Sequence, residues 1–333
     1  MGRHLKSMQQ KVPSKFGKYT LAAEVTEGLD LRGKTAIVTG GTAGLGRETT
    51  RVLAMTGAHV IFTARDTAKG QKLAEEFRLL TKNPQVDFAV LDLFHVESAT
   101  NFAEQMLRKF PKIDLLILNA ATANCPLARN ELGIESQFMT NYVGHLIVAA
   151  ILAPALVAAA PARIITLTSA GHQASSIVWE DINFERREYK PMLGYAQSKT
   201  AMSLLAVELN RRLASRRVLA FTVRPGMVPD TNLSRFSNPS GDKEALMASI
   251  RALGFNTSDL KSIEAGTATT IWAATAEELD STPGGLYLED CQIAEQLQQP
   301  NYKDGFLPYA VDKAAAQRLW QMTESMLGRA FNV

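Results

Sequence analysis

A tyrosine and a lysine four residues apart, Tyr195 and Lys199, are the side chains in this chain best suited to carry out chemistry. On a helix, positions i and i+4 lie on one face, so the phenol and the ammonium group are presented together. A free tyrosine has a pKa of about 10, and a neighbouring positive charge lowers it. The pair is therefore a candidate proton-transfer device, with Tyr195 as acid or base and Lys199 as the group that tunes it. Because such spacings are common by chance, the assignment needs support from elsewhere in the chain.

A glycine-rich segment far upstream supplies that support. The short apolar run Ala36–Val38 is followed by Gly40, Gly44 and Gly46, and then by a helical pattern that continues through Met55. A run of this kind predicts a buried parallel strand. Small residues let the backbone approach a pyrophosphate, and the helix N-terminus offers unpaired N–H groups. A tight turn without a ligand is the alternative, since the spacing G-x-x-x-G-x-G differs from the fingerprint G-x-G-x-x-G.

Together with four further motifs in the same order, these features resemble the short-chain dehydrogenase/reductase family. The motifs are Thr39-Gly40-x-x-x-Gly44-x-Gly46, Leu118-Asn119-Ala120-Ala121, Asn141-Tyr142-Val143-Gly144-His145, Thr168-Ser169, Tyr195-x-x-x-Lys199 and Pro225-Gly226-Met227-Val228. The match covers about residues 30 to 290. Within the family, two segments resemble the retinol-dehydrogenase-like branch, namely Thr63-Ala64-Arg65-Asp66 and Gly194-Tyr195-Ala196-Gln197-Ser198-Lys199-Thr200.

The resemblance implies a catalytic set made of Asn141, Ser169, Tyr195 and Lys199. Tyr195 would donate a proton to a carbonyl oxygen during reduction, or remove one from an alcohol during oxidation, while Ser169 holds that oxygen. Lys199 would bind the nicotinamide ribose and lower the tyrosine pKa, and Asn141 would anchor a water that links Lys199 to solvent. Ser169 and Tyr195 are farther apart in the sequence than is common in the family, so a folded loop must bring them together.

The resemblance also implies a dinucleotide site at the carboxyl ends of the strands. Arg65 follows the second predicted strand, where an arginine accommodates the 2′-phosphate of NADP(H) and an acid would bind the 2′-hydroxyl of NAD(H). We expect NADP(H), with NAD(H) less favoured because of the adjacent Asp66. Thr231 is expected to contact the carboxamide, although the family pattern places threonine at position 230. The expected cofactor-binding residues are Gly40, Thr42, Gly44, Leu45, Gly46, Arg65, Asp92, Leu93, Asn119, Tyr195, Lys199, Pro225, Gly226, Val228 and Thr231.

Short apolar runs alternate with long amphipathic segments from Lys34 onward. This alternation predicts an α/β fold with a single Rossmann-type, doubly wound parallel sheet and helices on both faces. The expected strands are Ala36–Val38, Val60–Phe62, Phe88–Leu91, Leu115–Leu118, Ile164–Leu167 and Val218–Val223, and the expected helices include Thr67–Leu80 and Val96–Phe110. The motif residues fall at the carboxyl ends of these strands or on the helices that begin there.

Three regions are expected along the chain. Residues 1–30 are an N-terminal arm, residues 31–300 are the catalytic domain, and residues 301–333 are a C-terminal extension packed on the same domain. The polar stretch at about 227–262 is predicted to be a loop-like lid over the substrate. Helical spacing in the extension predicts core packing for Leu319, Trp320, Met322 and Met326.

Composition narrows the functional classes. The chain has 333 residues, 46% of them hydrophobic, and a net charge of only +3, which disfavours a nucleic-acid partner. Two distant cysteines, Cys125 and Cys291, and the lack of a signal-peptide pattern favour the cytoplasm. The longest apolar run, Leu146 to Ala160, is too short to span a bilayer and contains Pro154, so no membrane span is expected. The five histidines do not cluster at metal-ligand spacing, so no metal is expected.

The sequence therefore predicts an NADPH-dependent oxidoreductase that interconverts a carbonyl and an alcohol. Apolar residues in the lid and in the loop before Tyr195 favour a hydrophobic small molecule; they are Trp179, Phe184, Leu233 and Phe236. Two alternatives stay open. One is an enoyl reductase, epimerase or dehydratase of the same fold, and the other is a non-catalytic NADP-binding sensor or scaffold. The resemblance implies a homodimer or homotetramer, unless the C-terminal extension covers the pairing helices.

Overall fold

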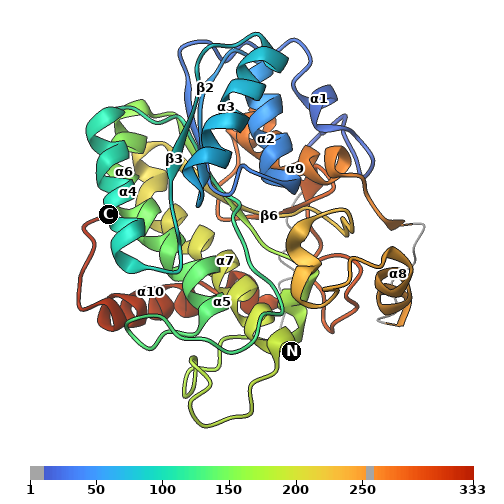
Figure 1. Cartoon of the computed structure of the whole chain (residues 1–333). Coiled ribbons are helices and arrows are strands. Elements are labelled where there is room, and N and C mark those ends of the chain that lie inside the picture. The colour runs from blue at the N-terminus through green and yellow to red at the C-terminus, as the bar shows by residue number, and fades with distance from the viewer. Residues whose placement is uncertain (1–10, 253–258) are drawn as a thin grey trace, which may run out of the picture.

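One sheet lies at the centre of the molecule, and its strand order fixes where a ligand can bind (Figure 1). The structure is a computed structural model that describes residues 11–252 and 259–333. Within them the order is β3-β2-β1-β4-β5-β6-β7-β8, so the direction of strand addition reverses between β1 and β4. Strands β1 to β7 are parallel, and β8 is antiparallel to β7. The strands are β1 Thr35–Val38, β2 His59–Ala64, β3 Val86–Val90, β4 Leu115–Leu118, β5 Ala162–Leu167, β6 Val218–Arg224, β7 Tyr287–Glu289 and β8 Gln292–Ile293.

Helices cover both faces of this sheet, which confirms the predicted doubly wound α/β fold. One face packs against α1 Ala22–Val25, α2 Gly44–Met55, α3 Thr67–Thr81 and α9 Ile263–Thr275. The other packs against α4 Val96–Lys109, α6 Gly144–Ala159, α7 Pro191–Leu213 and α10 Lys313–Leu327. Successive side chains of a strand point to opposite faces. In β1, Ile37 therefore joins one core, and Ala36 and Val38 join the other.

The most apolar helix begins earlier than the sequence suggested. A continuous helical run from Ser136 to Ala159 comprises α5 Ser136–Phe138, the π-helical turn η1 Met139–Val143 and α6. The whole run is long and apolar enough to cross a membrane by length and composition, whereas the sequence expectation considered only Leu146 to Ala160. However, 78% of its most apolar window is buried inside the protein, as in the core helix of a globular domain.

The described part of the N-terminal arm is bound to the body of the protein. The backbone N–H of Val12 donates to Gln292 Oε1 at 2.9 Å, and Gln292 Nε2 donates to the Val12 carbonyl at 2.8 Å. Farther along, Ala22 and Val25 of α1 are buried in the same core as α9. Residues 1–10 of the predicted arm lie outside the described residues.

The predicted lid contains more regular structure than its polar composition suggested. It includes the 3₁₀ turn η4 Asn232–Phe236 and the helix α8 Lys243–Ala252, and residues 253–258 lie outside the described residues. The expectation of a purely loop-like segment is therefore wrong. Its far end is anchored by Lys261, whose Nζ pairs with Asp290 at 2.6 Å and whose backbone N–H donates to the Met227 carbonyl at 2.9 Å.

The C-terminal extension packs on α7 through α10. Leu319 and Trp320 are each 1% exposed, and Met322 and Met326 pack against the same core, as their spacing predicts. The Trp320 ring also lies 4.2 Å from the guanidinium carbon of Arg212 on α7. The extension thus covers part of the surface of α7.

Replacing Trp320 with alanine is expected to lower the free energy of unfolding by about 3–5 kcal/mol, because a large buried ring leaves a cavity. Trp320→Phe is the matched control. The indole Nε1 has no hydrogen-bond partner among residues 11–252 and 259–333. This change therefore removes less volume and breaks no hydrogen bond seen there. Urea unfolding of the three proteins tests the expectation, and equal losses for the two variants would contradict it.

Candidate active site

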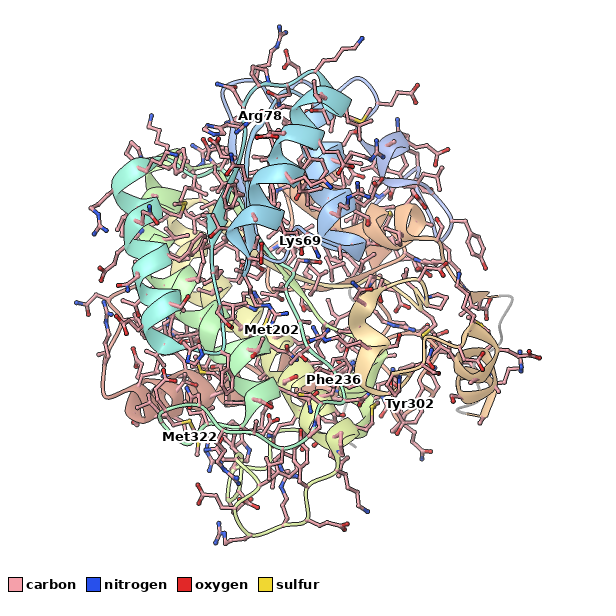
Figure 2. The ribbon with its side chains drawn as sticks, viewed as in Figure 1. Lys69, Arg78, Met202, Phe236, Tyr302 and Met322 are labelled. Carbon is pink, nitrogen blue, oxygen red and sulfur yellow. The ribbon has the colours of Figure 1, made fainter. Side chains whose placement is uncertain are left out.

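A cleft of about 740 Å³ opens at the carboxyl ends of the strands, beside the point where strand order reverses. All of the predicted cofactor-binding residues line it, and Ser169 lines it as well. Asn141 is the one predicted site residue that does not. The cleft extends from Lys69 on α3 to Phe236 on the lid, and Figure 2 shows these two side chains well apart. The structure thus brings together motifs that are distant in the sequence.

The glycine turn at one wall of the cleft has the geometry of a phosphate cradle. Gly40 has a φ of +71°, which side chains disfavour, and a Cβ at Gly46 would overlap the Gly40 carbonyl and the Asn119 amide. Asn119 Nδ2 holds the turn against β4 by donating to the Thr39 carbonyl at 2.8 Å. Helix α2 then begins with Ala43 as its N-cap, which offers no side-chain capping bond. Its first N–H groups are therefore available for a dinucleotide's phosphates.

Tyr195 and Ser169 meet inside the cleft despite the long loop between them. Tyr195 lies on α7, is 5% exposed, and lines the same cleft as Ser169, whose side chain is near enough to influence the pKa of the phenol. Ser169 Oγ also accepts from the backbone N–H of Gly171 at 3.1 Å, which fixes the serine rotamer. Burial raises the pKa of Tyr195 to about 12, and the nearby Ser169 side chain opposes that rise. The phenol is therefore protonated at neutral pH.

Lys199 lies one helical turn beyond Tyr195 and is also buried. Its Nζ donates to the Leu167 carbonyl at 3.0 Å and lies 5.7 Å from the centroid of the Tyr195 ring. Burial lowers the pKa of Lys199 to about 7. The sequence predicted that Lys199 lowers the tyrosine pKa. In this structure the group that opposes the rise in that pKa caused by burial is Ser169.

The buried amine gives a testable dependence of stability on pH. The pKa of Lys199 falls from 10.5 to about 7 on folding. Between these values the unfolded chain holds a proton that the folded protein lacks, so this group's contribution to stability rises with pH. We expect Lys199→Met to be more stable than the native protein at pH 6, by a few kcal/mol, and this gain to shrink toward pH 10. Urea unfolding at several pH values measures it, and a gain independent of pH would contradict it.

Asn141 is buried behind the residues that line the cleft. It lies in the π-helical turn η1, is fully buried, and its Nδ2 donates to the Thr122 carbonyl at 2.9 Å and to Ser198 Oγ at 2.8 Å. Its Oδ1 accepts from the Thr122 N–H at 2.8 Å. The side chain therefore fixes the loop after β4 and a residue beside Lys199. Its role as a water anchor stays a prediction.

The adenosine end of the cleft carries two cations. Arg65 lies at the end of β2, and Lys69, which sequence reasoning missed, follows in the first turn of α3. Asp66 caps that helix, because its Oδ1 accepts from the Lys69 N–H at 2.7 Å. Asp66 does not line the cleft. Among the described residues, neither Arg65 nor Lys69 has a carboxylate within 4.0 Å.

The register of the segment after β6 is resolved by two neighbouring side chains. Thr231 lines the cleft, and its Cγ2 lies 3.3 Å from the position a Cβ would take on Gly44. Asp230 instead forms an ion pair with Lys243 of α8 at 3.0 Å. The threonine that faces the glycine turn is therefore Thr231, one residue later than the family pattern.

The apolar lining differs in part from the expectation. Leu233 and Phe236 of the lid line the cleft, but Trp179 and Phe184 do not. Trp179 stacks with Arg318 of the extension, and Phe184 packs against Tyr189. Sequence composition could not distinguish these packing roles from a substrate-facing role. Lining residues that composition missed include Pro126, Leu127, Met227 and Arg235.

Comparison with known proteins decides the family. Residues 34–241 match the sequence profile of the family described as short chain dehydrogenase. The protein is a short-chain dehydrogenase/reductase. Its relatives also confirm the resemblance to the retinol-dehydrogenase branch. Mouse retinol dehydrogenase 13 is 34% identical over 298 residues, covering 90% of this chain and 85% of the relative.

A fungal relative and a solved structure agree. Oxidoreductase calI of Penicillium decumbens is 34% identical over 308 residues, covering 89% of this chain and 87% of its own. The crystal structure of an uncharacterized protein from Mycobacterium paratuberculosis is 28% identical with a TM-score of 0.69, covering 95% of this chain and all of that one. This short-chain dehydrogenase/reductase is therefore an oxidoreductase acting on CH–OH or C=O groups, with a fold that binds NAD(P).

Proposed function

We propose that this enzyme is an NADPH-dependent reductase of a hydrophobic aldehyde or ketone, with Tyr195 as the proton donor. The observation that supports this most is that Tyr195, Ser169 and Lys199 line one cleft together with the glycine turn. When bound, the nicotinamide supplies the hydride that reduces the carbonyl carbon. The cradle at Gly40 and Gly46 fits such a dinucleotide, because it leaves room where side chains would block a phosphate.

The remaining chemistry belongs to the side chains of the cleft. Ser169 donates a hydrogen bond to the carbonyl oxygen and holds it beside the Tyr195 hydroxyl. Tyr195, protonated at neutral pH, donates its proton to that oxygen as the C–O bond becomes an alcohol. Lys199, whose pKa burial lowers to about 7, would hold the ribose hydroxyls of a bound dinucleotide and return a proton to the tyrosine. Oxidation of an alcohol uses the same groups in reverse.

The cofactor preference rests on the adenosine end. Arg65 and Lys69 line the cleft there, while the nearby carboxylate of Asp66 is engaged as a helix cap. Two cations beside a carboxylate that is already engaged favour the 2′-phosphate of NADP(H) over the free ribose hydroxyl of NAD(H). The substrate end is lined by Leu127, Met227, Leu233 and Phe236, which favours an apolar substrate.

The test is a series of aldehydes of equal reactivity and increasing alkyl length, assayed with NADPH by the loss of its near-ultraviolet absorbance. We expect kcat/KM to rise along the series, by up to about tenfold for each pair of buried methylenes. A preference for short polar carbonyls would contradict a hydrophobic substrate. An enone and its saturated ketone belong in the same assay, because reduction of the C=C bond alone would favour the enoyl reductase alternative.

A further inference from the structure

The C-terminal segment 301–309 is hydrogen-bonded to the turn that carries Ser169. This turn is η2 Ala170–Ala174, for which Ser169 is the N-cap. The Oε1 of Gln173 accepts from the backbone N–H of Asn301 at 2.9 Å and of Tyr302 at 2.8 Å. Its Nε2 donates to the Asp304 carbonyl at 2.9 Å. The same Nε2 donates more weakly to the Gly305 carbonyl at 3.4 Å. One buried glutamine thus joins the turn to four backbone groups of the segment.

His172 extends this connection to Ser169 itself. Burial lowers the pKa of His172 to about 4, so the imidazole is neutral at physiological pH. A neutral imidazole has one N–H donor and one acceptor. Nδ1 lies 2.7 Å from the Ser169 carbonyl and must donate to it, so Nε2 accepts from the Leu307 N–H, 3.4 Å away. The serine backbone is therefore coupled through one ring to the C-terminal segment.

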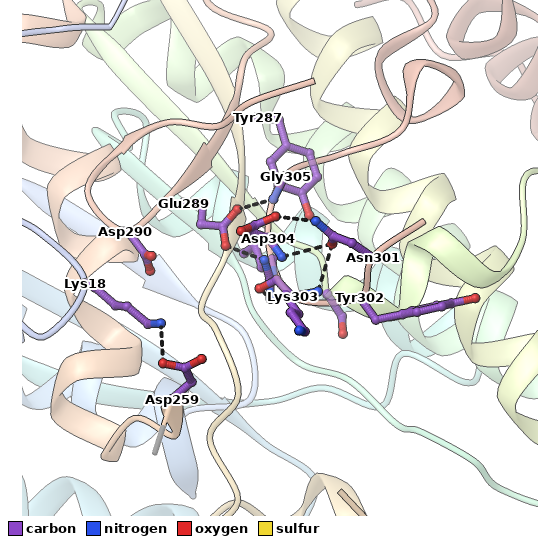
Figure 3. Close-up of polar contacts among 12 residues, drawn as sticks. Lys18, Asp259, Tyr287, Glu289, Asp290, Asn301, Tyr302, Lys303, Asp304 and Gly305 are labelled. Atoms are coloured by element: carbon purple, nitrogen blue, oxygen red, sulfur yellow. Dashed lines mark hydrogen bonds and ion pairs between the residues drawn. The ribbon is translucent and has the colours of Figure 1, made fainter. Parts of the chain in front are cut away.

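A buried ion pair holds the other side of the segment. Arg224 at the end of β6 is 3% exposed, Glu289 at the end of β7 is 8% exposed, and the two side chains form an ion pair. Arg224 Nη2 donates to the Lys303 carbonyl. Glu289 Oε2 accepts from the Gly305 N–H at 2.7 Å (Figure 3). Arg224 also lines the cleft and directly precedes the Pro225-Gly226 segment.

The location of this pair needs an explanation, because a buried ion pair contributes little net stability compared with apolar residues of similar size. Here the ion pair orients the 303–305 loop. The arginine and the carboxylate each hold a backbone group of the 303–305 loop, and that loop is the anchor for Gln173. The chain of contacts runs from Glu289, through the segment, to the Ser169 turn and so to the Tyr195 hydroxyl.

We propose that Glu289 and Gln173 are positioning residues for Ser169, acting through the C-terminal segment. This inference rests on the proposed function, in which Ser169 holds the reacting oxygen. A catalytic hydrogen bond is effective only if its donor is held within about 0.5 Å of the productive position. Without the ion pair or the glutamine, the Ser169 turn loses an anchor while the cofactor cradle, on the other side of the cleft, keeps its own contacts.

The test compares Glu289→Gln, which keeps the shape but removes the charge, with Gln173→Ala, which removes four hydrogen bonds but no charge. We expect kcat and kcat/KM for a carbonyl substrate to fall about 10- to 100-fold in both. Substrate KM and the Kd for NADPH, measured by its fluorescence, should change less than twofold. Hydrogen–deuterium exchange of the peptide covering residues 169–175 should become faster in both.

Asp280→Asn is the matched control. It also removes a carboxylate from a buried arginine, Arg163, which it contacts at 2.6 Å, but Arg163 lies near the start of β5, at the opposite end of the sheet. We expect native kcat and native exchange at 169–175 in this variant, whatever its thermal stability. If both carboxylates had merely structural roles, losing either one would have the same effect on kcat. A loss of kcat in Glu289→Gln but not in Asp280→Asn therefore supports a positioning role.

Native kcat in both Glu289→Gln and Gln173→Ala would overturn the inference, as would an equal loss in Asp280→Asn. If the unmodified protein reduces no carbonyl and oxidises no alcohol, the proposed function fails, and positioning for catalysis fails with it. The exchange measurement then still shows whether the C-terminal segment holds the Ser169 turn. Kinetics and exchange together thereby distinguish a failure of the proposed function from a failure of the proposed contacts.

Discussion

Tyr195→Phe is expected to lower kcat for carbonyl reduction by about 10²- to 10⁴-fold, the usual contribution of a positioned acid. The phenyl ring fills the same space but cannot donate a proton or bond Ser169. Because the hydroxyl does not hold the glycine turn, the Kd for NADPH should change by less than about threefold. Steady-state kinetics and cofactor fluorescence measure the two quantities.

Tyr302→Phe is the control for this change, since Tyr302 is on the surface, 36% exposed, and its hydroxyl has no place in the cleft. It should keep native kcat. If Tyr195→Phe also kept full function in its native setting, the sensor or scaffold interpretation would replace the enzymatic one. A loss of NADPH binding that equals the loss of kcat would place Tyr195 in cofactor binding rather than in proton transfer.

Arg65→Ala is expected to lower kcat/KM for NADPH by about 10- to 100-fold while leaving kcat/KM for NADH unchanged. The magnitude follows from the loss of charge-assisted hydrogen bonds to a phosphate, each worth about 1.5–3 kcal/mol. NADH lacks that phosphate, so the arginine has no charged partner to lose. Parallel assays with both cofactors at a saturating carbonyl concentration give the ratio directly.

Arg78→Ala is the matched control, because Arg78 lies near the far end of α3, where it pairs with Asp87 at 3.0 Å (Figure 2). Arg78→Ala should leave kcat/KM for NADPH and kcat/KM for NADH unchanged. An equal fall in NADPH and NADH use on loss of Arg65 would contradict recognition of a 2′-phosphate. A preference for NADH in the native protein would contradict the cofactor proposal outright.

The sheet and its motifs were predictable because both depend on local patterns. Short apolar runs mark β1, β4 and β5, and amphipathic stretches mark α3 and α4 within one or two residues. Strands β7 and β8 were not predictable, since three-residue and two-residue strands carry no periodic signal. The polar stretch that forms α8 is equally uninformative, because Lys, Glu and Ala favour a helix only weakly without a packed face.

The site was predictable as a set of residues but not as a network. The spacing of Tyr195 and Lys199 gives their common face, and the resemblance adds Ser169, yet nothing local indicates that Asn141 points away from the cleft. Lys69 carried a usable signal, since it lies four residues after Arg65 at a helix start. Glu289 and Gln173 carried none. Their partners are far away in the sequence, and only tertiary packing brings these groups together.

The most direct test of the account is a crystal structure of the enzyme with NADP⁺ and an unreactive analogue of an apolar carbonyl substrate. The account predicts the nicotinamide beside Tyr195, with the analogue's oxygen within about 3.2 Å of both the Tyr195 and the Ser169 hydroxyls. It also predicts Arg65 on the 2′-phosphate. A nicotinamide bound elsewhere, or a Tyr195 hydroxyl turned away from the analogue's oxygen, would contradict it.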